Sequence, residues 1–307
     1  MEAFGGRALL AAALLLDAVF GEPDAVWRRF PHPVVLIGRL VAVLDERLNR
    51  GAARRLRGAA ALGIVVVVAA AVAVPLSLHP AVESVAAAVL LAQRSLCDHV
   101  GDVGRALSRS LVEGRRSVAM IVGRDPQDLD RSGVARAAIE SAAENWSDGL
   151  VAPAFWFVVG GLPGMAIYKA TNTADSMIGH RTERHRAFGW ASARFDDLLN
   201  WIPARLSGLL LCLIGRRRLA LSIMLRDARH HRSPNAGWPE AAMAANLGVA
   251  LAGPRNYGGV PTNDPFLYAE GRREATAVDV RDAVTILWMA WSILFLAAMV
   301  AAALGFF

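Results

Sequence analysis

Apolar residues along this chain are gathered into blocks, a pattern that a lipid bilayer requires. The blocks are separated by polar stretches, and the block at 58–78 contains no charged residue at all. Full crossings are expected at about 5–20, 58–78, 81–92, 198–214 and 283–307. The pattern therefore predicts an all-α fold: a polytopic helical membrane protein with about 5 transmembrane helices, plus broken or re-entrant helices and amphipathic cytoplasmic helices.

Two further helices are expected outside these crossings. The block at 150–168 contains Pro153 and the run Gly160-Gly161-Leu162-Pro163-Gly164, which predicts a broken or re-entrant helix. A capped helix is expected to begin near 132, because Asp130 or Ser132 can accept the free N–H groups of its first turn.

Basic residues lie beside the apolar blocks, and 32 of the 33 are arginine; the one lysine is Lys169. Arginine-rich loops between short spans mark the cytoplasmic side, so these arginines indicate orientation in a membrane and not nucleic-acid binding. We expect one integral membrane domain over 1–307, in the inner membrane, with cytoplasm-facing polar loops at about 21–57, 94–148, 169–197 and 215–282.

Common catalytic signatures are missing from the sequence. There is no Walker A loop, because Lys169 is followed by Ala170, and no G-x-G-x-x-G, HExxH or G-x-S-x-G pattern occurs. Any chemistry must come from less common groups of polar residues, of which three stand out.

The first group is Glu140, Glu144 and Asp148, which are spaced one helical turn apart. Carboxylates on one helix face repel each other unless a cation lies between them, and oxygen ligands suit Mg²⁺. The alternative is a surface ladder that includes Arg136.

The second group follows directly on the apolar block at 150–168. Lys169, Asn172 and either Asp175 or Ser176 share one helical stripe at a depth where polar groups are costly unless they pair or face a cavity. A lysine suits a phosphate group, and the aspartate and asparagine offer oxygens to a metal ion. The alternative is an interfacial helix end with a snorkelling lysine.

The third group, in the segment 194–205, enters the block at 198–214. Asp196 and Asn200 share a helix face, and Arg205 lies deeper in the apolar block. Ordinary negative charge at a helix N-terminus explains Asp196 equally well, but it does not explain Asn200 or Arg205.

Five segments taken together identify a family resemblance. They are GEPDAVWRRFPHPVVLIGR, IVGRDPQDLD, IESAAENWSDGLVAPAFW, YKATNTADSMIGH and FGWASARFDDLLNWIPARL. In this order they resemble the cobalamin-biosynthesis cobinamide-phosphate synthases over most of the chain. The resemblance implies an ATP-dependent acid–amine ligase. Such a ligase joins adenosylcobyric acid to (R)-1-amino-2-propanol or its O-phosphate, which gives adenosylcobinamide or its phosphate.

Amide formation from a carboxylate requires activation, most simply as an acyl phosphate, and phosphoryl transfer requires Mg²⁺, cationic groups and alignment. We therefore expect ATP as co-substrate, Mg²⁺, and an active site that faces the cytoplasm. The roles expected are metal ligands (Glu140, Glu144, Asp175), nucleotide contacts (Lys169, Arg124, Arg181, Asn172), catalytic groups (Asp196, Lys169, Glu140) and substrate contacts (Glu22, His32, Asn200, Arg205). Asp196 either accepts a proton from the attacking amine or is a further metal ligand.

Two other classes of protein remain open. Broken helices with polar groups inside the membrane are typical of transporters, and a membrane signalling protein without catalysis is the other alternative. The expected partners are the corrinoid, the aminopropanol or its phosphate, the lipid bilayer and other enzymes of the corrinoid pathway. The residues do not distinguish the free amine from its phosphate.

Overall fold

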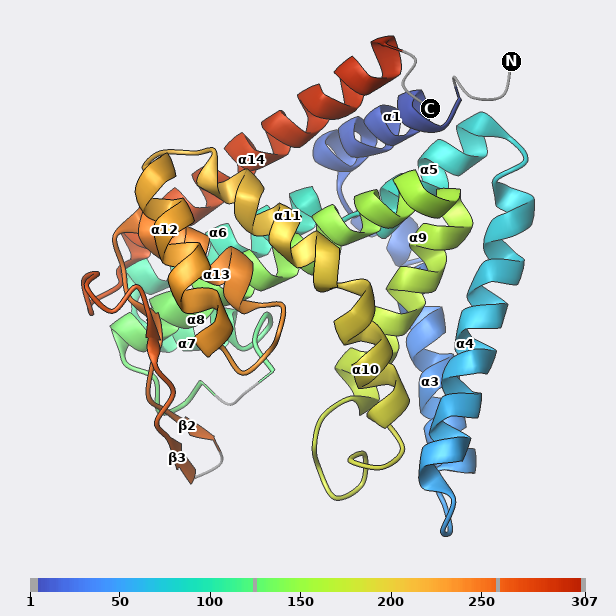
Figure 1. Cartoon of the computed structure of the whole chain (residues 1–307), viewed down its shortest axis with the longest axis horizontal. Coiled ribbons are helices and arrows are strands. Elements are labelled where there is room, and N and C mark those ends of the chain that lie inside the picture. The colour runs from blue at the N-terminus through green and yellow to red at the C-terminus, as the bar shows by residue number, and fades with distance from the viewer. Residues whose placement is uncertain (1–4, 124–125, 258–259, 305–307) are drawn as a thin grey trace. The chain divides into compact units, whose positions relative to one another are not determined.

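The computed structural model describes residues 5–123, 126–257 and 260–304, and within these residues the chain is almost entirely helical (Figure 1). This confirms the prediction of an all-α, polytopic membrane protein. The chain forms two compact units that alternate along the sequence: unit 1 is Met1–Ala92, Asp148–Asn200 and Ala297–Phe307, and unit 2 is Gln93–Ser147 and Trp201–Leu296. The expectation of one integral membrane domain stays a prediction.

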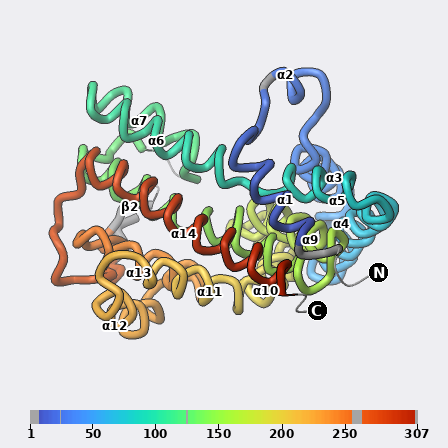
Figure 2. Tube along the Cα trace, turned by 90° about the horizontal axis from the view of Figure 1, so that it is seen from above, coloured from blue at the N-terminus to red at the C-terminus, as the bar shows by residue number. Residues whose placement is uncertain are grey.

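Unit 1 is built around α3, α4, α9 and α10, which pack on one another, with α1 and α5 forming a second pair (Figure 2). Its helices are α1 (Gly5–Phe20), α2 (Asp24–Trp27), α3 (Pro33–Leu48), α4 (Arg54–Leu76), α5 (Pro80–Leu90), α9 (Ala152–Ile178) and α10 (Trp190–Leu199). The π-helical turn η1 (Ser147–Val151) leads into α9.

In its described residues, unit 2 contains the remaining helices and four short strands. The helices are α6 (Gln93–Arg109), α7 (Leu111–Val118), α8 (Arg131–Trp146), α11 (Trp201–Cys212), α12 (Arg217–Asp227), η2 (Ala228–His230), α13 (Gly237–Leu247) and α14 (Ala277–Ala303), whose last turns belong to unit 1. Strand β1 (Leu251–Ala252) pairs antiparallel with β4 (Phe266–Leu267), and β2 (Arg255–Tyr257) pairs antiparallel with β3 (Val260–Thr262).

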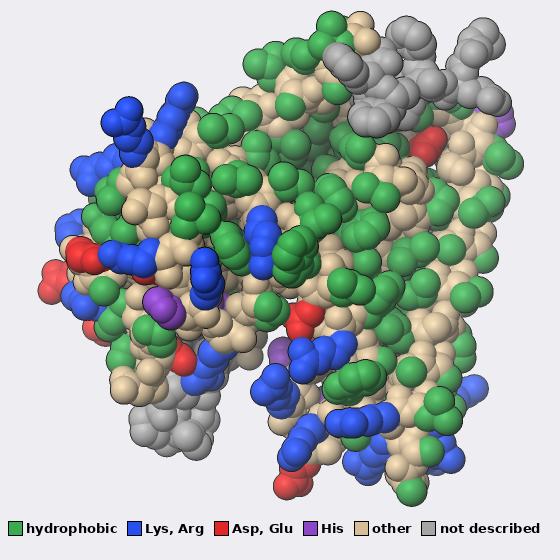
Figure 3. Space-filling view, in the orientation of Figure 1, with side chains coloured by type: hydrophobic (Ala, Val, Ile, Leu, Met, Phe, Trp, Pro, Cys, Tyr) green, Lys and Arg blue, Asp and Glu red, His purple; other side chains and the backbone are tan. Residues whose placement is uncertain are grey.

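Within the described residues, three helical stretches are long and apolar enough to cross a membrane: Arg54–Leu76, Arg131–Ile178 and Ala277–Ala303. Two shorter apolar helices lie at Ala8–Phe20 and Trp201–Cys212. Large apolar side chains such as Ile64, Val67 and Val72 are exposed on α4, and Figure 3 shows hydrophobic side chains along this helix. Exposed apolar surface on a helix of this length is what contact with lipid requires.

Two sequence expectations about unit 1 are wrong. The loop expected at 21–57 contains the 16-residue helix α3, which is capped by His32, has Pro33 in its first turn and buries Val41. The crossing expected at 81–92 is the 11-residue helix α5, and a helix of that length rises only about 16 Å, roughly half the hydrocarbon core of a bilayer.

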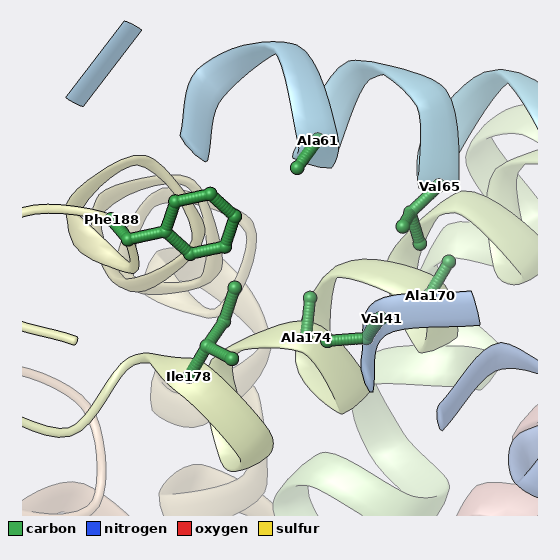
Figure 4. Packing of buried hydrophobic residues seen from close by; sticks show 7 residues of the cluster. All are labelled: Val41, Ala61, Val65, Ala170, Ala174, Ile178 and Phe188. Carbon is green, nitrogen blue, oxygen red and sulfur yellow. The ribbon is translucent and has the colours of Figure 1, made fainter. Parts of the chain in front are cut away.

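The core of unit 1 lies between α3, α4 and α9. Its fully or nearly fully buried side chains are shown in Figure 4: Val41, Ala61, Val65, Ala170, Ala174, Ile178 and Phe188. Where Phe188 approaches α4, the contact is made through Gly58: a Cβ added there would lie 1.8 Å from the Phe188 carbonyl oxygen. The absence of a side chain at Gly58 therefore allows the segment that leads into α10 to pack on α4.

The break expected in the block at 150–168 is present in α9. Gly160 and Gly161 have non-helical backbone angles, with φ +61° and ψ −160° at Gly161, and Pro163 follows. The Leu162 N–H next to the break donates to Glu83 Oε1 of α5 at 3.3 Å. A backbone group freed from the helix must find a partner inside a membrane, and this contact explains the single acidic residue of α5. Whether α9 re-enters the membrane stays a prediction.

An ion-pair clamp joins α3 to the segment between α9 and α10. Asp45 Oδ2 lies 2.6 Å from Arg184 Nη2 and 3.3 Å from His185 Nε2, and Asn49 donates to Asp45 Oδ1 at 2.8 Å. Burial alone would raise the pKa of Asp45, but the hydrogen bonds from Arg184, Asn49 and His185 outweigh it and hold the pKa below its ordinary value. The ionised carboxylate thus stabilises this part of the fold.

Asp45→Asn is expected to lower the free energy of unfolding by about 1 kcal/mol at pH 7, because the 62% exposure of the Arg184 side chain lets water screen the pair. A carboxyl group with a lowered folded-state pKa stabilises above its unfolded pKa and stops doing so as pH falls through the folded value. The difference between the two proteins should therefore begin to shrink near pH 4, the ordinary pKa of an aspartate, and vanish only below the lowered folded-state pKa. Thermal unfolding in detergent against pH measures it.

The matched control is Asp102→Asn, which removes an ion pair to Arg105 in which both side chains are 60% exposed. Its expected effect is close to zero at every pH. Equal losses in the two variants would contradict a stabilising role for the clamp.

Candidate functional site

Polar side chains from α9, α10 and η1 form a hydrogen-bonded group in unit 1, here called the carboxylate–amide cluster. Asn172 Nδ2 donates to Asp196 Oδ1 at 3.2 Å and lies 3.4 Å from Asp148 Oδ2. Asn200 Nδ2 donates to Asp196 Oδ2 at 3.0 Å, and the Tyr168 hydroxyl donates to Asn200 Oδ1 at 2.9 Å. Two amides therefore hold both oxygens of one carboxylate.

Helical spacing brings these groups together. Tyr168 and Asn172 lie four residues apart on α9, and Asp196 and Asn200 lie four residues apart at the end of α10, so each pair shares a helix face. Asp148 joins them from the π-helical turn before α9. Tyr168, Asp196 and Asn200 are buried. The cluster is therefore largely withdrawn from water and rigidly held.

Asp196 has the most altered acidity in the cluster. Burial raises the pKa of Asp196 to about 7, the nearby carboxylate of Asp175 adds to this increase, and the hydrogen bonds from Asn172 and Asn200 oppose it. A carboxyl group with a pKa near 7 exchanges a proton readily at neutral pH, which is the property required of a general base.

Lys169 lies on the same helix as the cluster and is attracted by three carboxylates, those of Asp148, Glu22 and Asp17. Asp17 is 3% exposed in the apolar helix α1, where an isolated charge would be costly. Lys169 thus connects the cluster electrostatically to the acids of the N-terminal region, and Glu22, one of the expected substrate contacts, is an exposed member of this group.

His32, another expected substrate contact, has both ring nitrogens engaged. Nδ1 accepts from the Val34 N–H at 3.2 Å and caps α3, and Nε2 lies 3.1 Å from the Val89 carbonyl oxygen. A carbonyl oxygen only accepts, so Nε2 carries the proton and the ring is neutral. Burial lowers the pKa of His32, opposed by the charge of Glu22 and by the hydrogen bond to Val89. The described geometry gives His32 a structural role, and its substrate contact stays a prediction.

Three of the expected site residues that the structure describes belong to unit 2. Glu140 is buried and its Oε1 accepts from the Ala252 N–H at 2.7 Å, so it fixes β1 to α8, while Glu144 is exposed. The Arg205 guanidinium carbon lies 4.3 Å from the ring centre of Trp201 and 4.5 Å from that of Trp238. Both contacts are cation–π interactions that engage the guanidinium group.

The expected metal ligands are not gathered into a ready-made site. Among residues 5–123, 126–257 and 260–304, no group of three or more His, Cys, Asp or Glu side chains could hold a metal ion. Glu140 and Glu144 lie in unit 2, whereas Asp175 lies in unit 1 with its carboxylate against Gly179. The metal assignment of these three residues stays a prediction, and Arg124 lies outside the described residues.

The remaining nucleotide contact, Arg181, lines a pocket of unit 1 together with three other arginines, Arg55, Arg186 and Arg194. The sequence pattern does not single out Arg55 and Arg186, because arginines in loops beside apolar spans are expected from membrane orientation alone. It also does not single out Tyr168, although the spacing of four residues from Asn172 is a signal that could have found it.

The fold and the cluster define a class: a polytopic helical membrane protein with a buried, base-like aspartate held by two amides. Residues 10–287 match the model of the family described as CobD/Cbib protein. The chain therefore belongs to the CobD/CbiB family, which confirms the resemblance identified from the sequence segments.

Curated relatives agree with this assignment. The chain is 51% identical to "Cobalamin biosynthesis protein CobD" of Brucella suis biovar 1 (strain 1330), over 93% of this chain and 94% of the relative. It is 49% identical to the protein of that name from Rhizobium meliloti (strain 1021), with the same coverage. For Rhodobacter capsulatus the identity is 52%, over 90% of this chain and 89% of the relative. No solved structure matches this chain.

Proposed function

We propose that this protein acts in cobalamin biosynthesis as an ATP-dependent acid–amine ligase. It joins the free propionate of adenosylcobyric acid to (R)-1-amino-2-propanol or its O-phosphate, and it releases ADP and phosphate. Family membership and the names of the relatives support the pathway. The observation that carries the chemistry is Asp196, a buried carboxyl group with a pKa of about 7 between two amides.

The proposed reaction has two steps. The corrinoid carboxylate attacks the γ-phosphorus of ATP, which forms an acyl phosphate and releases ADP. The amine then attacks the acyl carbon, and phosphate leaves as the amide bond forms. The attacking nitrogen must lose a proton, and Asp196 accepts it while Asn172 and Asn200 orient the carboxylate.

Mg²⁺ bound with ATP would supply neutralisation of the charge on the transferring phosphoryl group. The described residues contain no group of three metal-binding side chains, so neither step of the proposed reaction depends on a metal ion bound by the protein alone. Asp175, beside the cluster in unit 1, is the proposed contact to Mg²⁺, while the metal contacts of Glu140 and Glu144 and the phosphate contact of Lys169 stay predictions. ATP is cytoplasmic, so we propose an active site that faces the cytoplasm from the inner membrane.

The test is a condensation assay with the purified chain in detergent. The protein is incubated with adenosylcobyric acid, Mg·ATP and either amine, and corrinoid mass is followed. The expected result is a mass gain equal to condensation, dependent on ATP, and the preferred amine identifies the substrate. No mass gain with either amine, in protein shown to be folded, would reject the ligase.

A transporter is the second candidate, favoured by the break in α9. In transporters such breaks leave backbone groups for the substrate. Here the Leu162 N–H next to the break is already bound by Glu83, which weakens that argument. Uptake of corrinoid into vesicles without ATP consumption would support the transporter instead.

A further inference from the structure

A pocket of about 480 Å³ lies in unit 1 at the end of α9, the start of α10 and the start of α4. Its polar lining consists of four arginines, one tryptophan and one aspartate: Arg55, Arg181, Arg186, Arg194, Trp190 and Asp197. Figure 3 shows Lys and Arg side chains gathered around the lower ends of α4 and α10. The volume falls in the range of small-molecule binding pockets.

The lining has a large excess of positive charge. Four guanidinium groups face one carboxylate, and the contact between Arg194 and Asp197 is long, at 3.8 Å. Like charges held together repel, and an anion between them removes this cost. A guanidinium group offers N–H donors in a planar fork that matches two oxygens of a phosphate. Four such groups suit a ligand with more than one phosphate.

The start of α10 adds to the attraction for an anion. The N-cap residue Gly189 provides no side-chain hydrogen bond to the first turn, so the helix N–H groups there are not capped by a side chain. Gly189 also permits a close approach of the chain, since a Cβ at this position would lie 1.7 Å from the Ile178 carbonyl oxygen. The two ends of the 179–189 segment are thereby held together beside the pocket.

An aromatic wall completes the pocket. The Arg55 guanidinium carbon lies 5.4 Å from the centre of the Trp190 ring, and 46% of Trp190 is exposed. An exposed indole ring beside a cationic pocket offers a stacking surface for a planar, electron-rich group such as a nucleobase.

The pocket and the carboxylate–amide cluster share α9 and α10. Asp197 of the pocket follows Asp196 of the cluster in sequence, and the carboxylate of Asp175 lies against Gly179, which also lines the pocket. Asp175 is in turn close enough to Asp196 to help raise its pKa. A phosphate chain in the pocket would therefore lie beside the group that the proposed chemistry uses.

We propose that this arginine pocket binds the phosphate chain of a nucleoside triphosphate, with the base directed to Trp190. This inference rests on the proposed function, and it identifies where the phosphoryl donor binds. The same phosphate chemistry is found in anionic lipid headgroups, and the experiment below separates the two sources.

Binding is measured by calorimetry on the full chain in neutral detergent, without corrinoid. The probes are a non-hydrolysable ATP analogue and inorganic tripolyphosphate. Arg181→Gln/Arg186→Gln is expected to lower the affinity for both probes by about tenfold or more, because each hydrogen bond to a charged group contributes about one factor of ten in affinity. Arg186→Lys, which keeps the charge but loses the fork, is expected to lie between the wild type and the double variant.

The matched control is Arg216→Gln/Arg218→Gln, which removes two exposed arginines from the start of α12, in unit 2, and changes the net charge equally. The affinity of this control for both probes should stay within about twofold, because neither arginine lines the pocket and exposed charges are screened at physiological salt. An equal loss in both double variants would overturn the pocket assignment. A second outcome would also overturn the proposal. If phosphatidylglycerol micelles displace the probes from the wild type, while Arg181→Gln/Arg186→Gln keeps its affinity for the probes, the site is assigned to a lipid headgroup.

Failure of this inference is distinguishable from failure of the proposed function. ATP-dependent condensation with unchanged analogue affinity in Arg181→Gln/Arg186→Gln would leave the ligase in place and reject the pocket. Loss of analogue affinity in a protein that never condenses corrinoid would retain the pocket and reject the ligase.

Discussion

Asp196→Asn is expected to lower kcat of the corrinoid condensation by about 10²–10⁴-fold, the contribution usually made by a positioned general base. The asparagine side chain keeps the shape of the residue but cannot accept a proton. The measurement is the initial rate of corrinoid mass gain at saturating ATP and amine.

The wild-type protein also has an expected pH profile. With a pKa of about 7, Asp196 is ionised above neutral pH and protonated below it, so the rate should fall about tenfold per pH unit on the acid side. Asp196→Asn should lack this decline. A variant that keeps most of its kcat, with the wild-type profile, would exclude Asp196 as the base.

The melting temperature of Asp196→Asn distinguishes a catalytic role of Asp196 from a structural one. Because burial raises the pKa of Asp196, its ionised form is destabilising in the folded protein above the unfolded pKa. Asp196→Asn should therefore not lower the melting temperature at pH 8. Asp98→Asn, at an exposed ion pair with Arg94, is the control and should change neither the rate nor the melting temperature.

Gly58→Ala is expected to lower the free energy of unfolding by about 1–3 kcal/mol, the usual cost of an overpacked contact. The new Cβ would lie 1.8 Å from the Phe188 carbonyl oxygen, so the segment before α10 would have to move away from α4. Phe188 belongs to the core of unit 1, and that displacement also disturbs its packing. Thermal unfolding in detergent measures the loss.

Gly63→Ala provides a control on the same helix. Nothing lies within 4 Å of a Cβ at Gly63, and alanine has a higher helix propensity than glycine by about 1 kcal/mol. Its melting temperature should be equal to that of the wild type or higher. Equal melting temperatures of Gly58→Ala and Gly63→Ala would show that the close approach of the Phe188 backbone to α4 contributes little to stability.

Local features of the fold were predictable from the sequence. The first apolar helix was expected at 5–20 and is α1 (Gly5–Phe20), and the helix expected near 132 begins at Arg131 with Asp130 as its N-cap. The break at Gly160 and Gly161 was also expected. Each of these features depends on residues a few positions apart, whose local preferences decide the outcome.

Features that depend on distant contacts were not predictable. The arginine-rich segment 21–57 predicts a loop, although the apolar residues of helix α3 within it pack on α4 and α9. In the site, helical spacing paired Asp196 with Asn200, but only the packing of α10 on α9 brings Asn172 to the same carboxylate. Spacing also suggested Asp148 on a face with Glu140 and Glu144, but Asp148 lies in a π-helical turn with a different periodicity.

The two adjacent glycines in α9 are unequal in what they tolerate. Gly160 has a negative φ, and nothing lies within 4 Å of a Cβ built on it, so side chains can be accommodated there. Gly161 has φ +61° and ψ −160°, a combination open essentially to glycine alone. The bend of this helix therefore requires glycine at position 161 only. Replacement of Gly160 by another small residue leaves the bend unchanged.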